Sequence, residues 1–160
     1  MKAALEYLLE TRYPFMVRSE ETASQFKNMY QQFGCEIDDG WYSLLNSLCE
    51  EIMQVYNKHA CQPDIIVDQV KEKFGGLRFY YHFYGRPVQI HAFDAVGDFS
   101  SRMYPAGNAV HKEIANIVRK WENESLTVCE KCGARGVLRK ELPWICVLCD
   151  TCLVTNEEHS

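Results

Sequence analysis

The sequence predicts an α+β fold in which helices pack on a small antiparallel sheet, followed by a C-terminal four-cysteine zinc ribbon. Apolar residues recur at helical spacing over residues 40–59, whereas apolar and polar side chains alternate over residues 74–84. Near the C-terminus, two Cys-x-x-Cys pairs have the spacing of a zinc site. We therefore expect a core domain over residues 1–125, a zinc ribbon over residues 126–155 and a frayed tail at residues 156–160.

Three helices are predicted before residue 60. The first covers residues 2–11. The second covers about residues 20–33, with Ser19 as its N-cap and Gly34 at its C-terminal end. The third, about residues 40–59, carries the longest apolar stripe of the chain. That stripe consists of Trp41, Leu44, Leu45, Leu48, Ile52, Val55 and Tyr56.

Two strands are predicted after Pro63. Residues 64–70 contain the run Ile65-Ile66-Val67, whose β-branched density is typical of a strand. Residues 74–84 form the second strand, because apolar and polar side chains alternate along them. The two strands would pair as a hairpin or a small sheet that the helices cover.

A loop-rich segment separates this hairpin from the last helix of the core. Within residues 85–108, loop-prone positions are occupied by Gly85, Pro87, Pro105 and Gly107, and a short apolar strand is predicted near residues 88–93. A helix then covers about residues 108–124, with Asn108 as its N-cap.

Composition and charge exclude several classes of protein. The chain has 160 residues, of which 47% are hydrophobic, and a formal net charge of −5. This charge disfavours a strongly basic nucleic-acid binder, and no run of about 18 apolar residues is present to span a membrane. Glu6 and Glu10 lie where a secretory signal would need an apolar segment, so we expect a cytoplasmic protein without a membrane partner.

The chain has eight cysteines, five of which crowd together near the C-terminus. Without an export signal, paired Cys-x-x-Cys spacing indicates a metal site rather than a disulfide framework. Three further cysteines, Cys35, Cys49 and Cys61, are scattered through the first half of the chain. Because free cysteine is often buried, we expect these three thiols to lie in the core.

Two registers of metal ligands satisfy the spacing. Cys129 and Cys132 form the first pair, and either Cys149 with Cys152 or Cys146 with Cys149 forms the second. We favour Cys149 and Cys152, because residues 144–148 are typical of the strand that leads into the turn. Cys146 would then be a buried strand residue. Four thiolates fill the tetrahedral coordination of Zn²⁺, so we expect one structural zinc ion per chain.

Several sequence blocks together resemble a recurrent pattern in small uncharacterised proteins of bacteria, prophages and phages. These blocks are the run from Gln69 to Tyr80, the triplet Asp39-Gly40-Trp41, the Glu-x-x-Ser motif from Glu122 to Ser125, Cys129 to Gly133, and Trp144 to Cys152. The resemblance covers about residues 33–152, with a longer connection over residues 85–120. It implies a phage or mobile-element context. Because the last ligand is often histidine in that family, it also implies that Cys152 is a conservative ligand replacement.

The block KEKFGGLRFY combines basic, glycine and aromatic residues that could bind a phosphate or stack on a base. Its glycines lack the following Lys-Ser/Thr of a P-loop. The alternatives are a tight turn into a two-faced strand, with Arg78 paired to a carboxylate such as Asp39, and a surface that contacts another protein. The candidate binding residues in and near this block are Lys71, Lys73, Gly75, Gly76, Arg78, Tyr80, Asp39 and Trp41.

Two functions are compatible with these features. The first is a non-enzymatic, zinc-containing binding protein, encoded by a phage or mobile element, that binds and inhibits a host defence protein. The second is a nucleotide or single-stranded nucleic-acid binder that uses the KEKFGGLRFY region. We expect no enzyme, because the histidines are scattered and the serines lack a nucleophile motif.

Overall fold

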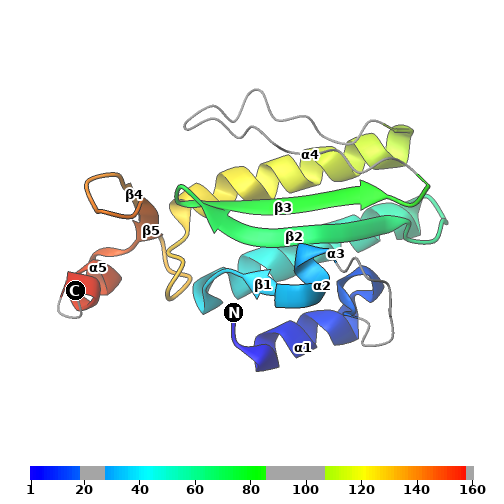
Figure 1. Cartoon of the computed structure of the whole chain (residues 1–160). Helices are drawn as coiled ribbons and strands as arrows, with labels where there is room; N and C mark the ends of the chain where they lie inside the picture. Colours follow the sequence, from blue (N-terminus) through cyan, green and yellow to red (C-terminus); the bar gives the residue numbers. More distant parts are fainter. Residues whose placement is uncertain (19–27, 86–106, 158–160) are drawn as a thin grey trace.

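The computed structural model describes residues 1–18, 28–85 and 107–157. Two helices, α3 (Tyr42–Lys58) and α4 (Ala109–Glu124), pack against each other beside the strands β2 (Ile65–Lys73) and β3 (Gly76–Phe83). Figure 1 shows α4 running along β3, with a small C-terminal module beyond the turn between the two strands. The fold class is therefore α+β, as predicted. In the described residues, no helix has the length and apolar character needed to cross a membrane.

The N-terminal part contains α1 (Ala3–Arg12), the short helix η1 (Pro14–Met16), α2 (Met29–Phe33) and the two-residue strand β1 (Cys35–Glu36). Gly34 ends α2 with a φ of 66°, as predicted.

The predicted helix over residues 20–33 is not continuous, because it is interrupted at Asn28. Asn28 has extended backbone and caps α2 by accepting a bond from the Gln31 amide, so no helix continues through it. The expected cap at Ser19 lies outside the described residues.

The three strands form a sheet in the order β1-β2-β3. β2 and β3 pair antiparallel, as predicted, with Val70 opposite Phe79 and Lys71 opposite Arg78. β1 adds a short parallel strand to β2 that the sequence analysis did not predict. This parallel pairing is possible because α3 supplies the crossover between the two strands.

The turn between β2 and β3 is shorter than predicted. β3 begins at Gly76 rather than at Phe74, because Phe74 and Gly75 form a two-residue hairpin loop in which both φ angles are positive, 54° and 74°. Two positive φ angles are typical of the tight turn that suits the twist of paired strands.

The core lies between the sheet and the helices. Its largest fully buried side chains are Trp41, Tyr30, Tyr56, Phe79, Phe83, Leu9, Met16, Leu45, Leu48, Ile52, Leu77 and Ile114. Cys35 and Cys49 are buried in it, as predicted. The prediction for Cys61 is wrong, because it follows the C-terminal end of α3 and is exposed.

Asn108 caps α4 as predicted, because its side chain accepts a hydrogen bond from the His111 amide.

The C-terminal module contains a two-stranded hairpin and a helix. The strands are β4 (Val137–Arg139) and β5 (Cys146–Leu148), and α5 (Asp150–Glu157) follows them. The short helix η4 (Ser125–Thr127) connects α4 to this module. α5 includes residues 156 and 157, which the sequence analysis assigned to the tail. The predicted short strand near residues 88–93 lies outside the described residues.

Candidate metal centre

Four cysteine sulfurs converge in the C-terminal module. The Sγ atoms of Cys129, Cys132, Cys149 and Cys152 all lie within 4.8 Å of one another, and those of Cys132 and Cys149 are 3.6 Å apart. Four sulfurs at the usual zinc–sulfur distance of about 2.3 Å would be about 3.8 Å apart in a tetrahedron. The cluster therefore has the donor type and the size to hold a metal ion.

These four cysteines are the set that the sequence analysis favoured as ligands. Cys146 lies in β5, is 5% exposed and does not belong to the cluster. The predicted placement of Cys146 as a buried strand residue is therefore confirmed.

Backbone groups shape both cysteine turns. Gly133 has a φ of 77° and donates its amide to the Cys129 carbonyl over 2.8 Å, which closes the first turn. In the second turn, the Cys152 amide donates to Cys149 Sγ over 3.4 Å. This bond lowers the pKa of the Cys149 thiol to about 7 and so favours the thiolate, which is the form that binds metal.

The first cysteine turn rests on the triplet Asp39-Gly40-Trp41, which forms the short helix η2. The Gly40 amide donates to the Glu130 carbonyl over 2.9 Å, and the indole of Trp41 donates to the Val128 carbonyl over 2.7 Å. A Cβ at Gly40 would lie 2.5 Å from the Cys129 carbonyl oxygen. Only glycine therefore lets the core approach the cysteine turn this closely.

The turn between β2 and β3 packs on the hairpin of the module. A Cβ at Gly75 would collide with Leu138 of β4. Glu72 links the two parts further, because one carboxylate oxygen accepts from the Gly75 amide at 2.6 Å and the other from the indole of Trp144 at 3.1 Å.

The Glu-x-x-Ser motif at the end of α4 bonds the outer side of β3. The Glu122 carboxylate accepts from the Phe79 amide at 2.8 Å, and the Ser125 hydroxyl accepts from the Leu77 amide at 2.9 Å. Ser125 also donates to the Glu122 carbonyl over 2.6 Å, and both side chains are fully buried. The motif thus satisfies two strand amides that β2 does not pair.

The candidate binding residues of the KEKFGGLRFY region are mostly buried or already bonded. Arg78 and Tyr80 are each 7% exposed, Trp41 is fully buried, and Gly76 lies buried at the start of β3. The Gly75 amide is held by Glu72.

The remaining candidates, Lys71, Lys73 and Asp39, each contact a close neighbour. Lys71 lies over the ring of Tyr80, with its Nζ atom 5.4 Å from the ring centre, and Lys73 lies near Phe74. Asp39, named above as one example of a carboxylate partner for Arg78, has a different partner. The Asp39 carboxylate instead bonds both the amide and the ammonium group of Lys2 at 2.8 Å.

The described histidines are packed or surface residues, as predicted. Each bonds a carboxylate at 2.9–3.0 Å: His59 bonds Glu113, His82 bonds Asp68 and His111 bonds Asp64.

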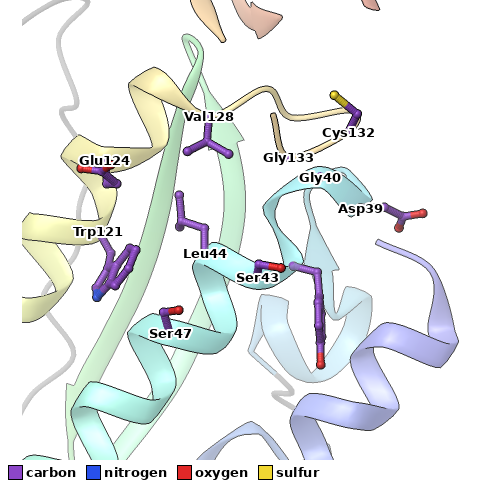
Figure 2. A pocket seen from close by; sticks show the side chains of 11 residues that line it. Asp39, Gly40, Ser43, Leu44, Ser47, Trp121, Glu124, Val128, Cys132 and Gly133 are labelled. Carbon is purple, nitrogen blue, oxygen red and sulfur yellow. The ribbon is translucent and has the colours of Figure 1, made fainter. Parts of the chain in front are cut away.

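Two hollows lie where the core and the cysteine module contact each other. The first, about 380 Å³, lies between α3, the end of α4 and the Cys132–Gly133 turn. In Figure 2, Leu44 and Ser47 face this space from α3 and Trp121 faces it from α4, while the Asp39 carboxylate points away.

The second hollow, about 390 Å³, lies on the side of Glu72 and Trp144. We call it the acidic hollow. It is lined by Met1, Glu36, Ile37, Asp38, Glu72, Glu130, Lys131 and Trp144.

Glu130 is the buried carboxylate of the acidic hollow, with 8% of its surface exposed. Burial, reinforced by the charges of Glu72 and Asp38, raises its pKa to about 7. The sequence analysis did not predict that Glu72 and Glu130 line the same hollow. Each residue belongs to one of the motifs described above, but 57 residues separate them in the chain, and only the fold brings them together.

No protein-family model, no curated protein and no solved structure matches this chain.

Proposed function

We propose that this chain is a non-enzymatic binding protein that holds one structural zinc ion and uses its cysteine module to bind a host protein. The observation that carries this proposal is the exposure of Trp144, which is 67% accessible although it belongs to a well-anchored hairpin. Large exposed aromatic side chains are enriched at protein interfaces.

Zinc is the metal that best suits the cysteine cluster. Thiolates are soft ligands, and a closed set of four is typical of structural zinc. The ion would cross-link the loop after η4 to the start of α5 and so hold the hairpin in place. Four protein ligands leave no position for a substrate or a catalytic water, which supports a structural role.

Trp144 has the properties of an anchor for a partner. Its indole N–H is held by Glu72 of β2, so its ring is oriented before any partner arrives. Val137 of β4, in the same hairpin, is also exposed. The module therefore exposes two large apolar side chains that the described residues leave uncovered.

The host protein as partner, its inhibition and the phage or mobile-element context come from the resemblance described above, and they belong to the proposal. The nucleotide or nucleic-acid function stays a prediction. Burial of Arg78 and Tyr80 does not favour it, and the Glu72 carboxylate at the Gly75 amide would repel a phosphate.

A capture experiment tests the proposal. The zinc-loaded chain is immobilised and exposed to bacterial lysate, beside the variants Trp144→Ala and Tyr7→Ala. Tyr7 on α1 is a matched control, because it is an aromatic residue of similar exposure (65%) away from the cysteine module. We expect a stoichiometric protein partner that Trp144→Ala loses and Tyr7→Ala retains.

Equal capture by both variants, or no stoichiometric partner, would contradict the proposal. Retention of oligonucleotides that weakens steeply with salt would favour the nucleic-acid function instead.

A further inference from the structure

The acidic hollow carries more negative charge than its own cations neutralise. Four carboxylates line it, against Lys131 and the amino group of Met1. Lys131 pairs with Asp38 at 2.8 Å, and the Met1 amino group donates to the carbonyls of Cys35 and Ile37. Among the described residues, neither Glu72 nor Glu130 has an ion-pair partner.

Glu130 provides a second, independent observation at the acidic hollow. Its residue surface is more than nine-tenths buried, yet its Oε2 atom has no hydrogen-bond partner. A buried carboxylate oxygen without a partner destabilises the folded chain, because it has lost its bonds to water. A cationic group in the hollow would remove this destabilisation.

The geometry decides which kind of cation fits. Among the described residues, only the four cysteines gather three or more metal-ligating groups within 4.8 Å. The carboxylates of the acidic hollow therefore do not converge as a metal site requires. They are distributed around a space of about 390 Å³, which suits a larger cation with several donors.

The position of Trp144 favours a guanidinium group as the cation that fits the acidic hollow. It lines the same hollow, with its N–H edge bonded to Glu72 and most of its surface exposed. A guanidinium is planar, has five N–H donors, bonds carboxylates in pairs and stacks on indole rings. A lysine ammonium would bind less favourably, because it does not stack on an indole ring as a planar guanidinium does and cannot bond carboxylates in pairs.

We propose that the acidic hollow receives an arginine side chain of the partner protein, which bonds Glu72 and Glu130 and lies against the ring of Trp144. This inference rests on the proposed function and gives the chemistry of the partner. It also accounts for a buried acidic residue inside the first Cys-x-x-Cys turn, where metal binding itself does not require one.

The test uses a short blocked peptide as the probe. The ¹⁵N-labelled, zinc-loaded chain is titrated with acetyl-Gly-Arg-Gly-amide and, separately, with the same peptide containing citrulline, which has nearly the shape of arginine but no charge. We expect the arginine peptide to shift the Trp144 indole signal and the amide signals around Glu130 at millimolar concentrations. The citrulline peptide should leave them unchanged.

Variants locate the site. Glu72→Gln and Glu130→Gln should each weaken binding of the arginine peptide about fivefold, the size of a partly exposed ion pair. Glu50→Gln removes the same charge from the exposed side of α3 and should leave binding unchanged. If Glu130→Gln disturbs folding, seen as lost signal dispersion, Glu72→Gln still decides the question.

Equal shifts from the two peptides, shifts confined to another surface, or binding that neither variant weakens would overturn this inference. Its failure is distinguishable from that of the proposed function. If capture of a protein partner depends on Trp144 while the arginine peptide causes no shift, only the inference fails. If the peptide binds here while capture does not depend on Trp144, only the proposed function fails.

Discussion

Gly40 and Gly133 pack backbone against backbone where the core meets the first cysteine turn. A Cβ at Gly133 would lie 2.8 Å from the Gly40 carbonyl oxygen, and a Cβ at Gly40 would lie 2.6 Å from the Cys132 amide nitrogen. Neither distance leaves room for a side chain, and the neighbours on both sides are backbone atoms that cannot rotate away. The two glycines therefore set how closely the cysteine module docks on the core.

Gly40→Ala should push the cysteine turn away from η2. We expect a loss of about 2–4 kcal/mol in unfolding free energy, as for other forced clashes in a packed interior. Gly85→Asn is the control, because nothing lies within 4 Å of a Cβ at Gly85 and asparagine tolerates its positive φ. Urea unfolding measures both variants. A Gly40→Ala chain as stable as the wild type would show that the close docking is not required.

The Glu122–Phe79 bond predicts a second stability effect. Glu122→Ala would leave the buried Phe79 amide without its acceptor, which costs about 1–3 kcal/mol. Ser125→Ala removes the acceptor of the Leu77 amide and should have an effect of similar size. Glu124→Ala, an exposed position on the same turn of α4, should change stability by less than about 0.5 kcal/mol. Thermal unfolding of the three variants separates these outcomes, and equal melting temperatures would contradict the bonding role.

The features that the sequence predicted well are those encoded by local patterns. α3 follows from its apolar stripe, α4 from its cap at Asn108, and the cysteine cluster from two short spacings. Each of these patterns lies within about twenty-five residues, so it could be recognised without knowing the fold.

The features that the sequence did not predict depend on contacts between distant segments. The motifs around Gly40, Gly75 and Glu122 were recognised as patterns, but their roles appear only where the core, β3 and the cysteine module meet. The positive φ of Phe74 could not be foreseen, because phenylalanine does not favour that conformation.

Cys146 and Cys152 offer a matched test of the ligand set. Cys152→Ser replaces a sulfur of the cluster, and zinc affinity should fall at least about 100-fold, more than losses measured for groups beyond the ligands. Cys146→Ser changes a buried thiol of β5 outside the cluster and should keep one zinc ion per chain, with a modest loss of stability. Competition with a chromogenic chelator measures the affinities. Stronger loss in Cys146→Ser would reverse the assignment.

Removal of the metal should unfold the cysteine module and leave the core folded. Among the residues that the structure describes, the buried cluster of the module is small: it consists of Cys129, Cys146 and Leu148, with Leu142, Cys149, Cys152 and Leu153 partly buried around it. So few apolar groups cannot stabilise a fold without a cross-link, whereas the cluster between the sheet and the helices is extensive.

Hydrogen exchange followed by NMR can separate the two parts. After addition of a strong chelator, amides of β4 and β5 should lose protection, and those in the middle of α3 and α4 should retain it. The Trp41 indole signal should also move, because its acceptor at Val128 lies at the base of the module. Zinc should restore the spectrum. Full protection of β4 and β5 in the metal-free chain would refute a structural role for the metal, since the hairpin would then be held by its docking on Gly75 and Glu72 alone.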